Sequence, residues 1–404
     1  MSRLQAQRIG ATIHREESMK TRYAVLAAMF GAVLISATCA GTVHAQTPSV
    51  GQPRELEPVA QFNGPMPTGV TVSQEGRIFV NFPRWGDAVS FTVAEIRDGR
   101  AVAYPSEEVS RFDAARAAET FVSVQSVVVD PRNRLWVLDT GSIEFAPPVP
   151  GGPKLVGIDL TTNRIFRSIR FPADVVLKTT YLNDVRFDMR HGKDGVAYIT
   201  DSSGGGPNGI IVVDLATGKS WRRLSDHHST KAEKNFNPVV DGQPLMRGQP
   251  PKPMTIGSDG IAISADGERL YYCALASRRV YSVATSALRD TAMSDAQVGA
   301  TVRDEGLKPG ASDGLETDAQ GRLYATDYEH NAINRRRLDG TYETLAQDPR
   351  LSWPDTLALA QDGYLYVIAN QVHRQARFQN GKDLRVKPYL LLRLKSDGRP
   401  VELR

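Results

Sequence analysis

One pattern recurs six times along the chain and limits its fold more than any other feature. Each copy has a short apolar strand, a turn built on Asp or Gly, and a second apolar strand. β-branched and aromatic residues flank the turns, as is typical of β-hairpins. The copies occupy residues 68–82, 125–141, 183–201, 258–275, 312–328 and 354–370.

Four of the copies are followed by a second pair of apolar segments, so that each unit supplies four short strands. Four-stranded units that repeat at roughly 40–50 residues are typical of β-propeller blades. Two separate β-sandwiches are the alternative, but they would not repeat one unit at near-regular intervals. The sequence therefore predicts an all-β fold, a six-bladed β-propeller, in one domain over residues 46–404. Residues 107–121 are expected to form a surface helix or loop between the first two blades, and residues 227–255 a loop over one face.

The N-terminal segment has the features of a secretory signal peptide. Residues 19–45 contain two basic residues, an uncharged apolar run and a small-residue ending. An uncleaved membrane anchor is the competing interpretation. We expect residues 1–45 to be an extension plus signal peptide, with either Met1 or Met19 as the start. This predicts a secreted or periplasmic protein with no stable membrane span after cleavage.

Removal of this segment changes the charge and the cysteine content. It takes away five basic and two acidic residues and lowers the formal net charge from +4 to +1. A nearly neutral chain gives no electrostatic reason to expect nucleic acid as a partner. Of the two cysteines, only Cys273 remains, and its apolar neighbours predict a buried side chain.

Polar residues open the first strand of most copies. The inner strand of each blade lines the channel of a propeller, so we expect these residues to meet at one mouth and to bind a ligand there. They are Gln125, Asn183, Asp184, Asp259, Asp313 and Asp355. Such residues also make Asx turns, which is the structural alternative. Clustered acids repel each other unless a cation, an amine or protons neutralise them.

Oxygen ligands in a ring suit a hard divalent cation such as Ca²⁺. Asn183, Asp259 and Asp313 are the predicted metal ligands. The remaining polar and aromatic residues of the repeats are expected to be structural. Asp139, Asp201 and Asp327 follow the second strands and are predicted to cap the next turn, and most tryptophans are predicted to pack between blades. No zinc-type histidine spacing and no G-x-S-x-G motif occur.

Several segments together resemble the major royal jelly protein and Yellow family of secreted six-bladed propellers. They are NFPRW (81–85), VQSVVVDPRNRLWVLDTG (124–141), the block at 181–227 and SDGIAISADGERLYYCAL (258–275). This resemblance implies the fold and secretion. Insect members are associated with pigmentation. Some are linked to conversion of dopachrome, and others bind small biogenic amines at the channel mouth. Bacterial relatives are described as dopachrome-tautomerase-related. The family offers no catalytic residues to transfer.

A more distant resemblance is to the gluconolactonase and regucalcin propellers, in which Glu, Asn and Asp hold a divalent cation. Asp313 matches the segment that carries the Asp, and Asn183 or Asp259 stands where the Asn is expected. The segment that would supply the Glu is absent from residues 55–69.

Three functions remain open at this point. The first is binding of an amine or quinone-like molecule, with or without isomerisation. Tyr181 or Tyr328 would stack on the ligand ring. In an isomerisation, a carboxylate at Asp184, Asp259 or Asp313 would move the proton. The second is metal-dependent hydrolysis of a lactone. The third is a non-enzymatic extracellular scaffold with a plugged channel.

Overall fold

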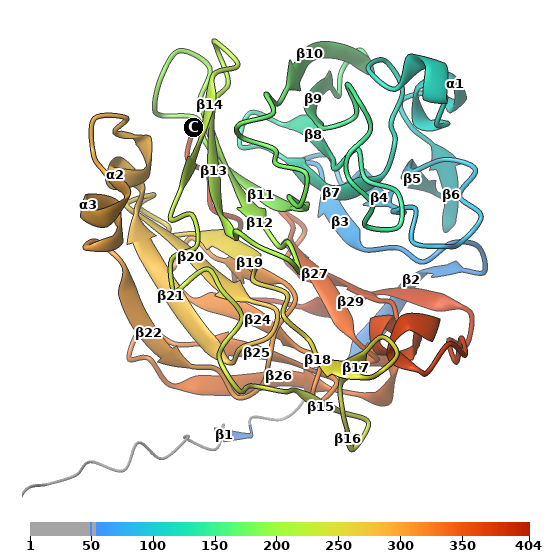
Figure 1. Cartoon of the computed structure of the whole chain (residues 1–404). Helices are drawn as coiled ribbons and strands as arrows, with labels where there is room; N and C mark the ends of the chain where they lie inside the picture. The colour runs from blue at the N-terminus through green and yellow to red at the C-terminus, as the bar shows by residue number, and fades with distance from the viewer. Residues whose placement is uncertain (1–48, 51–53) are drawn as a thin grey trace, which may run out of the picture. The chain divides into compact units, whose positions relative to one another are not determined.

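Six antiparallel sheets surround a central axis in the computed structural model (Figure 1). The structure describes residues 49–50 and 54–404, and the predicted extension and signal peptide at 1–45 lie outside them. Each sheet contains four antiparallel strands. In five sheets these four strands follow one another along the chain, and in the sixth the N-terminal strand β2 (Leu56–Phe62) supplies one of the four. The six-bladed β-propeller predicted from the repeats is confirmed.

The first three blades each use four strands that follow one another along the chain. Blade 1 contains β3 (Gly69–Val72), β4 (Ile78–Asn81), β5 (Val93–Arg97) and β6 (Arg100–Ala103). Blade 2 contains β7 (Val124–Val129), β8 (Arg134–Asp139), β9 (Lys154–Asp159) and β10 (Arg164–Arg170). Blade 3 contains β11 (Leu182–Asp188), β12 (Val196–Asp201), β13 (Gly209–Asp214) and β14 (Ser220–Arg223).

The last three blades include the closure of the ring. Blade 4 contains β19 (Ser258–Ile263), β20 (Arg269–Ala274), β21 (Arg279–Ala284) and β22 (Arg303–Leu307). Blade 5 contains β23 (Leu315–Thr317), β24 (Leu323–Asp327), β25 (Ala332–Arg336) and β26 (Tyr342–Gln347), with β1 (Ser49–Val50) added in parallel. Blade 6 contains β27 (Pro354–Leu359), β28 (Tyr364–Ala369), β29 (Tyr389–Lys395) and the N-terminal β2 (Leu56–Phe62). Pairing of β2 with β29 adds an N-terminal strand to the blade that the C-terminal strands form, and this closes the ring.

The six inner strands are β3, β7, β11, β19, β23 and β27, and each contacts its two neighbours around the axis. Their close approach explains the glycines of the repeated Asp-Gly pairs. A Cβ on Gly260 would lie 2.5 Å from the carbonyl oxygen of Asp313, and one on Gly314 would come closer still to that of Asp355. Glycine is therefore required so that adjacent inner strands can pack together.

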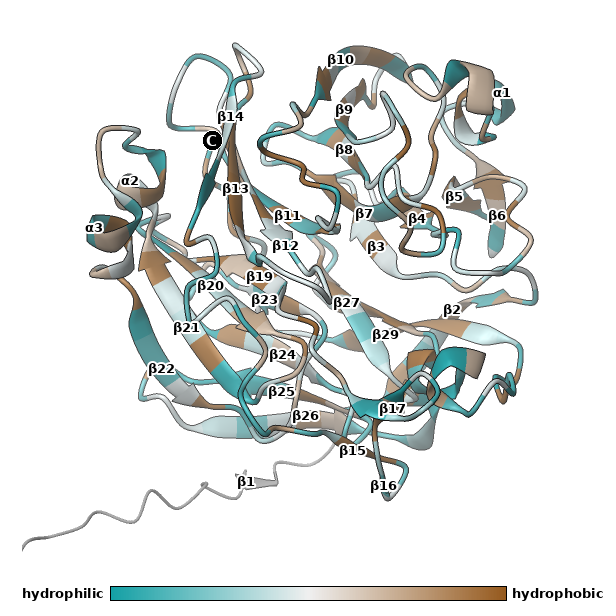
Figure 2. Ribbon diagram, viewed as in Figure 1, coloured by the Kyte–Doolittle hydropathy of each residue, from teal (hydrophilic) through white to brown (hydrophobic). Residues whose placement is uncertain are grey.

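The hydrophobic core lies between blades. Figure 2 shows hydrophobic segments along the strands, whereas the outer strand β22 is largely hydrophilic. Trp136 of blade 2 stacks on Phe187 of blade 3 with ring centroids 5.4 Å apart. The predicted burial of Cys273 is confirmed, since its side chain is inaccessible to solvent. Blade-to-blade packing of this kind stabilises the ring because each sheet buries both faces.

The second set of aspartates is structural, as predicted. Asp139, at the end of β8, accepts backbone N–H groups of residues 122–123 at 2.7 and 2.9 Å and the Nζ of Lys154 at 2.7 Å. Asp201 and Asp327 hold the equivalent places in blades 3 and 5, and both are buried. These carboxylates fix the turn before or after the strand that carries them.

Short helices and hairpins fill the connections. They are α1 (Glu107–Ser110), η1 (Ala114–Arg116), α2 (Thr285–Arg289), α3 (Asp295–Gly299), η2 (Pro349–Leu351), η3 (Val372–Arg374) and η4 (Ala376–Phe378). The predicted insertion at 107–121 does lie between the first two blades. The segment 227–255 contains the two-residue strands β15 (Val239–Val240), β16 (Gln243–Pro244), β17 (Met246–Arg247) and β18 (Lys252–Pro253). No helix among the described residues is long and apolar enough to cross a membrane.

Candidate functional site

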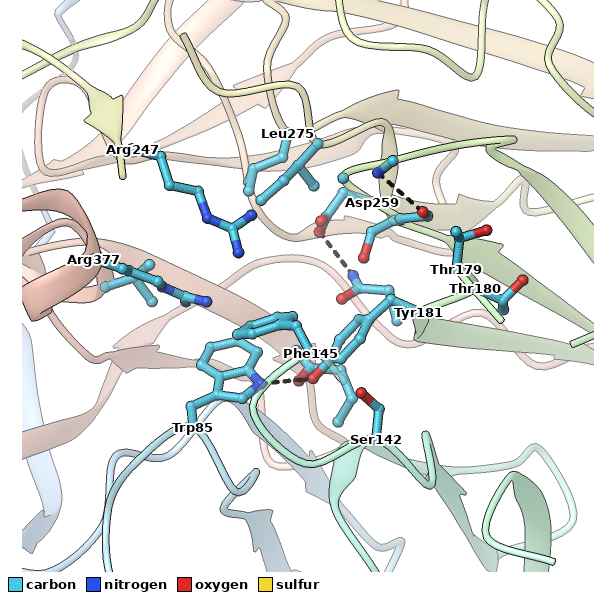
Figure 3. Close-up of a pocket in the computed structure, with 18 of the residues that line it drawn as sticks. Trp85, Ser142, Phe145, Thr179, Thr180, Tyr181, Arg247, Asp259, Leu275 and Arg377 are labelled. Carbon is cyan, nitrogen blue, oxygen red and sulfur yellow. Dashed lines mark hydrogen bonds between the residues drawn. The ribbon is translucent and has the colours of Figure 1, made fainter. Parts of the chain in front are cut away.

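A cavity of about 350 Å³ opens at the end of the channel where the inner strands begin (Figure 3). Its floor comes from the strand openings and its walls from loops of several blades. Five of the six predicted mouth residues line it: Gln125, Asn183, Asp259, Asp313 and Asp355. The propeller therefore brings together residues from five different blades that are far apart in the sequence.

Asp184, the sixth predicted residue, is not part of this lining. Its carboxylate accepts a hydrogen bond from Ser126 Oγ at 2.7 Å and lies 3.1 Å from a guanidinium nitrogen of Arg186. Arg186 also lies 3.7 Å from Glu316 of β23, the inner strand beyond β19. Because these side chains are bound to each other, Asp184 ties inner strands together below the cavity.

Three carboxyl groups form the cavity floor. Each of them accepts a hydrogen bond from a neutral side chain. The donor to Asp259 is Asn183 Nδ2 at 2.7 Å, and the donor to Asp313 is Trp353 Nε1 at 2.6 Å. The donor to Asp355 is Asn370 Nδ2 at 2.6 Å. Neutral donors thus orient each acid, with Thr356 Oγ1 as a second donor to Asp355 at 3.4 Å, and no lysine or arginine forms an ion pair with any of the three within residues 54–404. The floor acids are held in place without having their charge neutralised.

Burial raises the pKa of all three floor acids. The pKa of Asp313 is raised to about 6, mainly because burial disfavours its charged form, although hydrogen bonds from Trp353 and Asp259 partly offset this. The pKa values of Asp259 and Asp355 are also raised well above their ordinary range, first by burial and then by the charge of Asp313. The hydrogen bond between Asp259 and Asp313 raises the pKa of the first and lowers that of the second. Burial and mutual repulsion therefore favour protonated forms within this group of floor acids.

Aromatic side chains form one wall of the cavity. Phe145 lies between Trp85 and Tyr181, with ring centroids 5.0 Å from each (Figure 3). The indole N–H of Trp85 donates to the hydroxyl of Tyr181 at 2.7 Å, and that hydroxyl donates to Gln125 Oε1 at 3.1 Å. This chain of hydrogen bonds joins the wall to the floor and holds the rings in fixed orientations.

Tyr181 was predicted to face a ligand ring, and it lies in the wall. Tyr328, the other predicted stacking residue, does not line the cavity. Its ring stacks on Trp353 at 4.1 Å and its hydroxyl donates to the carbonyl of Leu275 at 2.5 Å. Tyr328 therefore supports the indole that orients Asp313. Sequence reasoning missed Phe145 and treated Trp85 with the core tryptophans, because neither belongs to the repeated hairpin.

Two arginines also line the cavity, and neither was predicted. Arg247 comes from β17 and Arg377 from η4, and both side chains point into the cavity in Figure 3. The guanidinium carbon of Arg377 lies 4.4 Å from the ring centroid of Phe145 and 5.0 Å from the ring centroid of Trp85. The guanidinium carbon of Arg247 lies 5.5 Å from the ring centroid of Phe145. Burial, with a contribution from the charge of Arg247, lowers the pKa of Arg377 to about 9. Both arginines lie in connections outside the repeated hairpins and carry no recognisable motif, so no sequence signal identified them.

The predicted metal ligands do not form a cation site in this geometry. Asn183 turns its amide nitrogen toward Asp259, and Asp313 accepts an N–H from Trp353. Residues 54–404 contain no group of three or more His, Cys, Asp or Glu placed to hold a metal ion. Two guanidinium groups line the same cavity and would repel a divalent cation.

Together, these features define a six-bladed β-propeller with a small-molecule-sized cavity at its channel mouth. The model of the major royal jelly protein family matches residues 122–400, which is more than half of the chain. The chain belongs to the major royal jelly protein family, as the segments described above had indicated.

Curated relatives carry Yellow names. A Yellow-related salivary protein, SP04, of Phlebotomus argentipes is 30% identical over 241 residues, which covers 55% of this chain and 57% of the relative. The salivary protein LJM17 of Lutzomyia longipalpis is 26% identical over 361 residues, or 84% and 79% of the two chains. Protein yellow of Drosophila melanogaster is 29% identical over 228 residues, or 53% and 40%. Apart from LJM17, the matches cover only part of these relatives: 57% of the length of SP04 and 40% of the length of Drosophila protein yellow.

Solved structures show the same fold at low sequence identity. A calcium-binding regucalcin from Agrobacterium tumefaciens has a TM-score of 0.54 at 14% identity, with 88% of this chain and 99% of that chain covered. A luciferin-regenerating enzyme has a TM-score of 0.54 at 13% identity, with 87% and 99% covered. The expected likeness to the regucalcin and gluconolactonase propellers is thus confirmed for the fold.

Proposed function

We propose that this protein binds a small aromatic molecule in the cavity at the channel mouth. One observation carries the proposal: a wall of three fixed aromatic rings and a floor of buried acids face the same cavity of about 350 Å³. Ligand pockets commonly have volumes of roughly 300–1,000 Å³, are lined mainly by apolar groups and carry a few polar groups that orient the ligand. This cavity is at the small end of that range, which suits a molecule of one or two rings.

The arrangement supports a specific pose. A flat ring packs against Phe145 and Tyr181, where offset or edge contacts between rings are favourable. A hydroxyl or amino group of the ligand then reaches Asp313, whose carboxylate accepts the indole N–H of Trp353 and has further lone pairs for a ligand donor. Gln125, held by the hydroxyl of Tyr181, offers its amide N–H₂ to a ligand oxygen.

The finer proposal is isomerisation of a quinone-like substrate of the dopachrome type. A tautomerisation moves one proton from carbon to oxygen and needs a base and an acid but no oxidant. Ionised Asp313 takes the proton from carbon, and Asp259 returns its proton to the carbonyl oxygen. The hydrogen bond between the two acids then transfers the proton from Asp313 to Asp259 and restores the starting state. The family membership supports this reaction class without assigning the residues.

We also propose that the protein is exported. The signal-peptide pattern in residues 19–45 supports this, as do relatives that are described as salivary proteins.

Calorimetric titration with a panel of aromatic amines, aromatic amino acids and catechols tests the binding proposal. We expect saturable binding of at least one ring compound, and loss of that binding in Phe145→Ala. Phe166→Ala is the matched control, because Phe166 is 45% exposed on β10 and outside the cavity. Failure of every ring compound to bind would refute the proposal.

Loss of dopachrome absorbance, followed with and without the protein, tests the isomerisation separately. Acceleration that is abolished in Asp313→Asn while ring binding persists would support the acid–base roles. Binding without acceleration would leave a binding protein and eliminate the isomerase.

A further inference from the structure

We propose that Arg247 and Arg377 form a subsite for a carboxylate, so that the aromatic ligand is an acid that also carries a hydroxyl or amino group. This inference rests on the proposed function, because it names the chemical class of the molecule in the same cavity. It differs from the expectation drawn from the acidic residues alone, which was a cationic ligand or a metal ion.

The first step is that neither arginine has an anionic partner among the described residues of the protein. In the described part of the chain, neither guanidinium has an ion pair or a side-chain hydrogen bond, and the solvent-inaccessible Nε of Arg377 has no acceptor. Their neighbours in the mouth loops differ. Arg385 lies 2.9 Å from Asp87 and 2.6 Å from Asp383, and Arg374 lies 2.9 Å from an aspartate. Arg385 and Arg374 thus have anionic partners in the protein, whereas Arg247 and Arg377, which face the cavity, have none within residues 54–404.

The second step is energetic. Both side chains are partly buried, and the Nε of Arg377 is inaccessible to solvent and has no acceptor, which is unfavourable because this N–H has lost its water and gained no hydrogen bond. Contact with the faces of Trp85 and Phe145 offsets part of that cost for Arg377. Its N–H donors lie around the edge of the guanidinium plane and remain available. A ligand anion in that plane would satisfy them with charge-assisted, bidentate hydrogen bonds.

The third step is the relative position of the two charges. The loops that carry the arginines are joined by a hydrogen bond from the backbone N–H of Gly248 to the carbonyl of Arg377, at 3.0 Å. Both guanidinium groups contact Phe145, so they flank the wall against which a ring would pack. Figure 3 shows them across the cavity from Asp259. A ligand that spans the cavity therefore meets cations at one end and acids at the other.

These positions select the ligand. An aromatic ring occupies the wall, a carboxylate reaches Arg247 and Arg377, and a hydrogen-bond donor reaches the floor acids. An amine without a carboxylate leaves the arginines unpaired, and a simple aromatic acid leaves the floor unused. The structure thus favours amphoteric aromatic acids over aromatic amines.

Matched compounds that differ only in the carboxylate test this inference. L-Tryptophan is compared with tryptamine, and L-DOPA with dopamine, by calorimetric titration of the full chain at pH 7. A charge-assisted hydrogen-bonded pair contributes enough for roughly a 10- to 100-fold difference in affinity. We expect the acid of each pair to bind that much more tightly than its amine.

Arg377→Gln should remove this preference by weakening the acids about tenfold or more while leaving the amines unchanged. Arg377→Lys keeps a charge but loses the planar fork, and should recover part of the preference. Arg164→Gln is the matched control, because Arg164 is exposed on β10 and outside the cavity. A denaturation midpoint measured for each variant separates a folding defect from a binding defect.

The outcomes distinguish the inference from the function on which it rests. Amines that bind as tightly as their acids, with binding still lost in Phe145→Ala, would overturn the carboxylate subsite and leave the binding function intact. An unchanged acid preference in Arg377→Gln and in Arg247→Gln would also overturn it. Absence of binding by both members of both pairs, together with every other ring compound, would refute the proposed function itself.

Discussion

Replacing the floor acid Asp313 by asparagine should stabilise the folded protein at neutral and alkaline pH. The substitution keeps the shape of the side chain, and the amide oxygen can still accept the indole N–H that Asp313 now accepts from Trp353 at 2.6 Å. It removes a charge that burial disfavours. Functional acids differ in this way from structural ones, because they are retained despite a cost to folding.

The magnitude follows from the raised pKa of Asp313. The rise from 3.8 to about 6 corresponds to about 3 kcal/mol, since each pKa unit is worth about 1.4 kcal/mol. For an acid whose pKa is higher in the folded than in the unfolded protein, this penalty is absent below pH 3.8. It develops as the pH rises and is complete above about pH 6. The advantage of Asp313→Asn should therefore be close to zero at pH 4 and approach about 3 kcal/mol at pH 8.

Urea denaturation of the wild type and Asp313→Asn, repeated from pH 4 to pH 8, measures this difference. Asp139→Asn is the matched control, because Asp139 is equally a repeat-borne acid but is paired with Lys154 at 2.7 Å and fully buried. Breaking that pair leaves a buried ammonium without its anion, which typically costs about 3–5 kcal/mol. The two substitutions should thus act in opposite directions at pH 8. If Asp313→Asn destabilised the protein as Asp139→Asn does, or if its effect did not vary with pH, the reasoning about the cavity floor would be wrong.

Three further predictions concern the same region. Gly260→Ala should lower the free energy of unfolding by about 1–3 kcal/mol, because its Cβ would lie 2.5 Å from a carbonyl oxygen of the next inner strand; Gly64→Ala, where nothing lies within 4 Å, should have little effect in the same denaturation assay. Tyr181→Phe removes the hydroxyl between Trp85 and Gln125 and should weaken calorimetric binding of a ring ligand by about 2- to 10-fold; unchanged affinity would show that the hydrogen-bonded chain does not orient the wall. Chelation with EDTA should change neither the denaturation midpoint nor ligand affinity, and a stoichiometric metal detected by elemental analysis would contradict our interpretation of the floor.

The fold could be predicted because the same pattern recurs in six segments, so the prediction does not depend on any single one of them. Hairpin turns and β-branched strands recur in each copy, and the inner strands must then converge on one axis. The same argument, from the sequence alone, correctly placed five residues around one cavity: Gln125, Asn183, Asp259, Asp313 and Asp355. The position of a residue in the repeat determines its position on the axis, and that relation needs no knowledge of the loops.

Asp184 shows where this relation ends. It follows Asn183 directly, and the two side chains of consecutive strand residues point in different directions. Asn183 faces the cavity, whereas Asp184 contacts Ser126 and Arg186. The sequence placed both at the strand opening but did not determine which one faces the ligand.

The aromatic wall and the arginines could not be predicted in the same way. Phe145, Arg247 and Arg377 lie in connections of different length between strands, and each is unique to its blade. Their convergence depends on loop conformations such as the one tied by Gly248 and Arg377. Local patterns contain no information about such contacts.

This division has a chemical consequence. The acids come from the repeated strands, which also carry the fold, whereas the aromatic rings and the cations come from loops. A substitution among the floor acids therefore changes both stability and chemistry, as the comparison of Asp313→Asn with Asp139→Asn is designed to show. A substitution at Arg247 or Arg377 removes an unpaired charge and breaks no ion pair within residues 54–404. Ligand choice in this propeller can therefore vary through its loops while the acid pair and the ring of blades stay unchanged.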